Sequence, residues 1–291
     1  MHLRRKLRNF GIAMLPLKGI TRPVFIVGCG RSGTTIFGTA LSKHRHVTYL
    51  HEPRHLWASA YPETDIWTPE AYSRDGKLVL TSADVEPRKT KKLSRLFRFE
   101  IIKSRRPILI EKLPANNFRL NFIHQMFPDA RFIHIYRNGL EVARSIEKLS
   151  ESGRWFGANF YKWDKIVQYA LDRDDIKNLP ALCTTYFDKG LLEWRLSTEA
   201  AVEFLRHLPY DAFFELDYDE LLEHPIDTIS RVLEFIGIDS DLEVNKFVSE
   251  SFVRRTTKLG RCNISEKEQI LGGKLLPLSM DGEKGLTRRC V

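Results

Sequence analysis

A phosphate-binding pattern without its lysine stands near the start of the chain. The apolar residues 23–28 run directly into CGRSGTT at residues 29–35. Gly28, Gly33 and Thr35 fit the pattern G-x-x-x-x-G-K-[ST], but Thr34 stands in the place of its lysine. Backbone N–H groups of such a loop bind an anion together with the dipole of the following helix. The spacing therefore predicts a phosphate cradle without the lysine that reaches the β and γ phosphates in nucleoside triphosphatases.

Charged side chains also follow three other apolar runs that have the composition of strands. Glu52, Lys112 and Arg137 each come one or two residues after such a run. Ligands of a parallel sheet bind at the carboxyl ends of its strands. We therefore expect these three side chains to lie beside the cradle.

The order of apolar runs and helical patterns predicts the fold. Helical patterns follow the first, third and fourth of five expected strands, and this alternation builds a parallel sheet. We expect an α/β fold, a single P-loop-like domain with a central parallel sheet of about five strands flanked by helices. The expected strands are residues 23–28, 47–50, 107–111, 130–136 and 212–218, and the expected helices are residues 34–43, 116–126 and 140–149.

Two further stretches have helical patterns. Residues 88–106 predict a basic amphipathic helix, whose cations fit a solvated surface better than a polyanion site. Residues 223–250 predict two amphipathic helices, with Gly237 ending the first and Asp239 or Ser240 capping the second.

The composition is that of a globular protein with an excess of cations. The formal net charge is +9 and the pI is near 9.4, which favours an anionic ligand, an acidic polymer or a membrane surface. The four cysteines lie far apart and form no zinc or disulfide pattern. We expect a basic N-terminal arm at residues 1–21 and one domain at 22–291. No apolar run is long enough to span a bilayer, so we expect a cytoplasmic or peripheral membrane protein.

Two elements of the chain resemble the sulfotransferases that use 3'-phosphoadenosine 5'-phosphosulfate (PAPS). RSGTT at residues 31–35 is similar to the 5'-phosphosulfate loop of that family. RFIHIYRNGLEVARSIEKL at residues 131–149 is similar to its 3'-phosphate element, in which an arginine after a strand and a serine eight positions later bind the phosphate. EKLPANNFRLNFIHQMFPDARF and FFELDYDELLEHPIDTISRVLEFIGI also look like family segments, so the resemblance covers most of residues 23–238.

The resemblance implies a site for the donor PAPS, with no metal. A sulfuryl group carries less charge than a γ-phosphoryl group, so fixed cations and amides can stabilise its transfer without magnesium. For Arg137 the spacing alone leaves an alternative open, an ion pair with Glu141 four residues later. The PAPS-binding residues that the resemblance implies are Arg31, Ser32, Gly33, Thr34, Thr35, Arg137, Ser145, and, in a C-terminal loop, Lys258, Gly260 and Arg261.

The expected catalytic base separates two branches of the family. The cytosolic phenol and steroid branch has a histidine two residues before the proline of the third-strand segment, where this chain has Lys112. The chain thus looks closer to the tyrosylprotein and carbohydrate sulfotransferases, in which a glutamate is the base, and Glu52 has that place. The resemblance makes Lys112 and Arg31 the catalytic cations, while His51 and His55 stay open as alternative bases.

The acceptor that the resemblance implies is a hydroxyl or an amine of a carbohydrate, a peptide or a small molecule. The positive net charge suggests an anionic one. Aromatic side chains in residues 57–67 and 154–163 could stack on a sugar or phenol ring. The second stretch fits a helix core equally well.

Two other classes of function stay open. A P-loop kinase would use ATP and magnesium through Thr35 and through Asp217 at the end of the fifth expected strand, although the missing lysine argues against it. A non-catalytic basic protein would bind nucleic acid or an acidic membrane through residues 88–106 and the N-terminal arm. No nucleic-acid motif supports the first of these partners.

Overall fold

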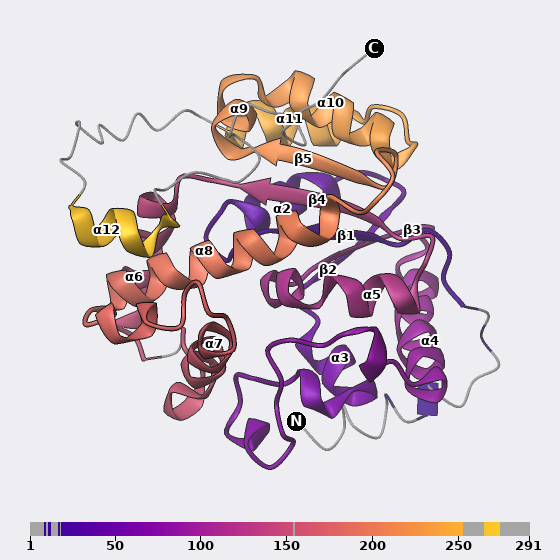
Figure 1. Cartoon of the computed structure of the whole chain (residues 1–291). Coiled ribbons are helices and arrows are strands. Elements are labelled where there is room, and N and C mark those ends of the chain that lie inside the picture. The colour runs from indigo at the N-terminus through magenta and orange to yellow at the C-terminus, as the bar shows by residue number, and fades with distance from the viewer. Residues whose placement is uncertain are drawn as a thin grey trace.

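A five-stranded parallel sheet forms the centre of the molecule (Figure 1). The computed structural model describes residues 9, 11–12, 17, 19–153, 155–252 and 265–273. The strands lie in the order β2-β3-β1-β4-β5, and every neighbouring pair is parallel. This confirms the expected α/β fold, and each strand lies within one residue of its expected bounds. The strands are β1 (Val24–Val27), β2 (Val47–His51), β3 (Ile108–Lys112), β4 (Arg131–Tyr136) and β5 (Phe213–Asp217).

Helices cover both faces of the sheet and bury two apolar clusters. Side chains of a strand alternate between the faces, so Val24 and Ile26 of β1 enter one cluster while Phe25 and Val27 enter the other. The Val24 face is covered by α2 (Thr34–Ser42), α9 (Tyr218–Glu223), α10 (Pro225–Ile236) and α11 (Leu242–Ser251). The Phe25 face carries α3 (Arg54–Ala60), α4 (Pro87–Ser104), α5 (Leu120–Met126), α6 (Gly139–Ser150), α7 (Tyr161–Leu171), α8 (Tyr186–Leu205) and α12 (Glu266–Leu271).

None of the helices in the described parts of the chain combines the length and the apolar character needed to cross a membrane.

The basic segment forms α4 as expected, with Leu93, Leu96, Phe97 and Ile101 buried against the sheet layer. Short 3-10 helices occupy the connections. They are η1 (Pro62–Thr64), η2 (Pro69–Ala71), η3 (Ser82–Asp84), η4 (Pro114–Arg119), η5 (Ala158–Phe160) and η6 (Leu179–Leu182).

Two of the expected helix boundaries are wrong. The helix expected at 116–126 begins only at Leu120, because η4 precedes it and its buried Asn117 and Arg119 side chains bind distant backbone groups. Gly237 ends α10 with φ +85°, as expected. The cap of α11 is Asp241, whose carboxylate accepts the Glu243 N–H, and neither Asp239 nor Ser240.

Candidate active site

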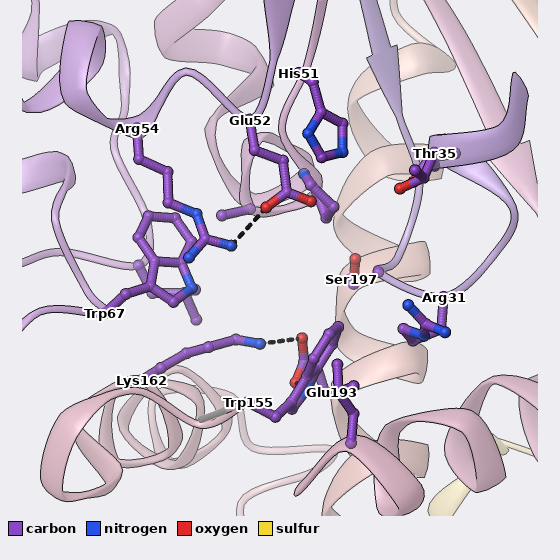
Figure 2. Close-up of a pocket in the computed structure, with 16 residues that line it drawn as sticks. Arg31, Thr35, His51, Glu52, Arg54, Trp67, Trp155, Lys162, Glu193 and Ser197 are labelled. Atoms are coloured by element: carbon purple, nitrogen blue, oxygen red, sulfur yellow. Dashed lines mark hydrogen bonds and ion pairs between the residues drawn. The ribbon is translucent and has the colours of Figure 1, made fainter. Parts of the chain in front are cut away.

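A pocket of about 420 Å³ lies where β1, β2 and β3 end (Figure 2). We call Gly30, Arg31, Thr34 and Thr35, which follow β1, the loop wall, and we call Trp67, Leu78, Trp155, Lys162 and Glu193 the opposite wall. His51, Glu52 and Arg54 enter the pocket from the end of β2. Pro114, Ala115, Leu149 and Ser197 complete its lining.

The loop between β1 and α2 has room only for glycine at three positions, and at Gly28 a Cβ would lie 2.3 Å from the Ile135 carbonyl oxygen. Gly33 has φ +90°, and a Cβ built there would lie 2.2 Å from the Tyr218 ring. A Cβ at Gly30 would lie 2.5 Å from Trp155. The Gly28 N–H donates to Asn117 Oδ1 at 2.6 Å, which fixes the start of the loop. Such close backbone approach, followed by a helix start, leaves N–H groups available to an anion.

A lysine from another strand reaches this loop. Lys112 ends β3, and its Nζ donates to Thr35 Oγ1 at 3.0 Å and to Glu52 Oε1 at 2.8 Å. The other oxygen of Glu52 accepts from Arg54 Nη2 at 2.7 Å, and Arg54 lies 4.1 Å from the centre of the Trp67 ring. The chain therefore supplies from β3 the ammonium group that its own loop sequence lacks.

The charged groups near the end of β2 shift one another's pKa values. Burial alone would raise the pKa of Glu52, but Lys112, Arg54 and His51 outweigh it and lower the pKa below its usual value. Complete burial lowers the pKa of Lys112, although Glu52 acts in the opposite direction. Burial and the charge of Lys112 also lower the pKa of His51. Glu52 is therefore an ionised carboxylate at neutral pH.

The two elements expected to bind phosphate meet at Arg31. Arg31 Nε donates to Ser145 Oγ at 3.0 Å, and Arg137 Nη1 donates to the Arg31 carbonyl at 3.4 Å. Arg137 also makes the ion pair that the sequence left open, with its Nη2 at 2.7 Å from Glu141 Oε2, and its guanidinium lies 4.7 Å from the Tyr218 ring centre. Arg137 and Ser145 both contact Arg31 but are not part of the pocket lining.

The opposite wall carries a second, buried ion pair. Lys162 Nζ donates to Glu193 Oε1 at 2.6 Å, and Trp155 Nε1 donates to Glu193 Oε2 at 2.8 Å. Figure 2 shows this pair across the pocket from Arg54 and Glu52. The aromatic stretches pointed to Trp67 and Trp155, but no sequence pattern pointed to Lys162 or Glu193.

The 3-10 helix η4 joins the two walls. Asn117, besides accepting from Gly28, donates to Ser197 Oγ at 2.9 Å. Arg119 is fully buried and donates to the carbonyls of Thr64, Lys77 and Leu78, at 3.0, 2.6 and 3.0 Å. Neighbouring residues of one short segment thus hold the loop wall and the connection that carries Trp67 and Leu78.

A buried carboxyl group lies beside Lys112. Glu111 is fully buried on β3, where it accepts from Trp57 Nε1 at 2.9 Å and from Asn116 Nδ2 at 3.1 Å. Burial raises its pKa to about 8. No sequence pattern indicated this group, because its raised pKa depends on complete exclusion from water in the folded chain.

The remaining expected residues have different outcomes. Ser32 is buried, and its Oγ has no hydrogen-bond partner among the described residues. His51 lines the pocket and His55 does not. The Asp217 carboxylate caps α9 by accepting the Asp219 N–H and lies outside the pocket lining, which removes the proposed metal ligand of the kinase alternative from the site. Lys258, Gly260 and Arg261 lie outside the described residues.

Comparison with known proteins gives one family. A family model described as the sulfotransferase family matches residues 23–242. The chain is similar to the sulfotransferase domain of the Synechococcus PCC 7002 olefin synthase (TM-score 0.52, 16% identity, 90% of this chain and 89% of that one). It is also similar to the sulfotransferase domain from the curacin biosynthetic pathway (TM-score 0.53, 12% identity, 89% and 98%). At these identities the two likenesses show the fold.

Curated relatives are similar over part of their length. An uncharacterized protein of Aquifex aeolicus is 28% identical over 220 residues, which are 74% of this chain and 25% of the relative. The omega-hydroxy-beta-dihydromenaquinone-9 sulfotransferase Stf3 of Mycobacterium bovis is 28% identical over 147 residues, 49% of this chain and 32% of the relative. The matched parts thus span only a quarter to a third of these relatives.

Proposed function

This chain belongs to the sulfotransferase family, and from that premise we propose that it transfers the sulfuryl group of PAPS to a hydroxyl or amine group of an acceptor. One observation carries the proposal. The buried Lys112 touches both the hydroxyl of Thr35 in the glycine loop and the carboxylate of Glu52 in the pocket. A single cation thus joins an anion cradle to an oxygen base.

The donor fits the loop and the groups behind it. The glycines bring backbone N–H groups close to the pocket, and the Ser32 hydroxyl is buried without a partner. Both features suit the 5'-phosphosulfate end of PAPS, with Gly33, Thr34 and Thr35 beside it. Arg137 and Ser145, in contact with Arg31, would bind the 3'-phosphate. Lys258, Gly260 and Arg261 stay proposed nucleotide contacts from the family resemblance.

The reaction uses the charges that surround the pocket. The acceptor oxygen or nitrogen forms a bond to sulfur while the bond from sulfur to the bridging phosphate oxygen breaks, and the electron pair of that bond leaves on 3'-phosphoadenosine 5'-phosphate (PAP). Glu52 takes the acceptor proton. Lys112 and Arg31 stabilise the negative charge that develops on the leaving phosphate.

A lowered pKa makes Glu52 a weaker but fully ionised base. It keeps the carboxylate free of a proton at neutral pH, and the proton it accepts can pass to solvent because the side chain is 26% exposed. His51 is the alternative base in the same pocket. The contact between Glu52 and Lys112, which also touches the loop, favours Glu52.

The lining of the pocket favours an uncharged acceptor. We expect the acceptor between the end of β2 and the opposite wall. The two cations described there already have carboxylate partners, since Arg54 is paired with Glu52 and Lys162 with Glu193. Trp67, Leu78 and Trp155 offer ring and aliphatic surface. We therefore propose a neutral acceptor with a ring or aliphatic body next to its hydroxyl or amine, and the name of the mycobacterial relative adds long-chain terminal alcohols to the compounds to be tried.

The proposal is tested by PAPS turnover with phenols, neutral sugars and long-chain alcohols as acceptors. Glu52→Gln should lower kcat by about 10²- to 10⁴-fold, the usual contribution of a general base. It should leave PAP affinity nearly unchanged, because the amide oxygen still accepts from Lys112. His51→Gln is the matched control and should keep most of the turnover. Full activity of Glu52→Gln would sink the assignment of the base.

A further inference from the structure

One face of α4 carries a row of cations that the pocket does not use. Arg88, Lys91 and Arg98 lie at intervals that place them on one side of the helix, with Arg95 and Ile102 in the same row, and Arg105 follows as the C-terminal cap. We call Arg88, Lys91, Arg98 and Arg105 the cationic stripe. The buried residues Leu93, Leu96, Phe97 and Ile101 occupy the other side. At a rise of about 1.5 Å per residue the stripe is about 25 Å long.

The stripe differs from the other cations of the same helix, which are already engaged. Lys89 pairs with Glu63 and Glu86, Lys103 pairs with Glu100, and Lys92 donates to the Ser59 carbonyl. Arg88, Lys91, Arg98 and Arg105 make no hydrogen bond or ion pair with any residue that the structure describes. Their charges are available to a partner.

The stripe is a local feature and not a share of a generally basic surface. Pro87–Ser104 carries seven Lys and Arg residues and one acid, Glu100. The rest of the described residues carry more Asp and Glu than Lys and Arg. A polyanion that approaches the described surface is therefore attracted to this helix in particular.

The side chains between the cations favour a lipid surface over nucleic acid. Ile102, between Arg98 and Arg105, is 50% exposed, and an aliphatic group suits the headgroup region of a membrane. The aromatic residues of α4 do not help nucleic acid, because Phe97 is buried and Phe99 packs against the core, leaving no platform for bases. We propose that the cationic stripe docks this protein reversibly on an anionic membrane surface.

The expected strength follows from the number of free cations. One Lys or Arg near an anionic leaflet strengthens binding by about fivefold, so four of them give a preference on the order of several hundredfold over a neutral leaflet. The preference should fall as salt screens the charges. Binding of this size positions a protein at a surface without anchoring it permanently.

The test is cosedimentation of the full chain with lipid vesicles. Wild type should bind vesicles of phosphatidylcholine and phosphatidylserine at a ratio of about 7:3, release them at high salt, and ignore vesicles of phosphatidylcholine alone. The triple variant Arg88→Glu, Lys91→Glu and Arg98→Glu should bind about a hundredfold more weakly, at about fivefold for each site. A control variant with Lys43→Glu, Lys177→Glu and Lys246→Glu changes the net charge equally at exposed positions on other elements and should keep its binding.

A thermal melt of each variant separates misfolding from loss of docking, since the stripe side chains make no hydrogen bond or ion pair among the described residues. Equal loss of binding in both triple variants would overturn the proposal, because net charge alone would then explain it. If the stripe bound a short DNA duplex and not the vesicles, the partner of the stripe would be nucleic acid and the membrane proposal would be wrong.

Discussion

The loop wall and the opposite wall of the pocket are built in different ways. The loop wall comes from one stretch of six residues, Gly30 to Thr35, placed by a strand end, a glycine turn and a helix start. The opposite wall comes from the connection that carries Trp67 and Leu78, from Trp155 and from Lys162 at the start of α7, and from Glu193 in α8. Buried side chains, chiefly Glu193 and Arg119, hold those segments in place. A binding wall can thus be specified by local backbone geometry or by distant buried groups, and this pocket uses both.

The largest expected effect on this comparison comes from the link between Asn117 and the loop. Asn117→Ala leaves the buried Gly28 N–H without an acceptor, which costs about 2 kcal/mol. We expect PAP to bind at least about tenfold more weakly, measured by calorimetry, and the Gly28 amide to exchange hydrogen faster. Ser197→Ala, which removes the hydroxyl that accepts from Asn117 and keeps the Ser197 carbonyl, is the matched control and should leave PAP affinity unchanged. Equal affinity in Asn117→Ala and wild type would show that the loop holds its shape alone.

The second effect concerns the buried carboxyl of Glu111, which holds α3 through Trp57. Burial raises its pKa from 4.5 to about 8, so between these values the folded chain keeps a proton that the unfolded chain has lost. Stability should therefore fall as pH rises from 5 to 8, by up to about 1.4 kcal/mol per pH unit. Glu111→Gln removes this titration, and its melting temperature should decline less over that range than that of wild type. Parallel pH profiles for the two proteins would contradict a protonated Glu111.

The smallest effect is expected from Arg119, which lies two residues after Asn117 in η4. Arg119→Lys keeps the charge and loses the planar fork that serves three carbonyls, at a cost of about 1 kcal/mol. Hydrogen exchange should become about fivefold faster across residues 61–80 and stay unchanged across residues 24–42. PAP affinity should also stay the same. If the loop wall loosened together with residues 61–80, the two walls would be one unit and the comparison would fail.

The sequence could predict the fold and the loop wall because both depend on local patterns. Apolar runs, turn residues and helix periods located every strand, and the glycine spacing located the start of α2. The structure places β4 next to β1, and this order brings Ser145 within reach of Arg31. The predicted start of the helix at 116–126 and the predicted cap of α11 were wrong. Hydrogen bonds of Asn117, Arg119 and Asp241 to distant parts of the chain determine both boundaries.

The opposite wall could not be predicted in the same way. Lys162 and Glu193 have no characteristic spacing, since one lies on α7 and the other on α8, and only packing brings them within 2.6 Å. Arg54 lies only two residues from Glu52 in the sequence. Its stacking on Trp67 could still not be predicted, because the connection that carries Trp67 has an irregular backbone. Burial in the folded chain determines which charged groups form this wall, and burial of a charged residue cannot be read from a single sequence.

The most direct test of the account is a thermal-shift titration with PAP and with ATP, in EDTA, on wild type and on Arg137→Ala. At about 100 times its Kd a ligand adds about 2.7 kcal/mol, which is several degrees for a chain of this size. The account predicts a shift of wild type with PAP, little with ATP, and loss of the PAP shift in Arg137→Ala. No shift with PAP, together with a shift by ATP once magnesium is restored, would contradict the donor site and favour a kinase.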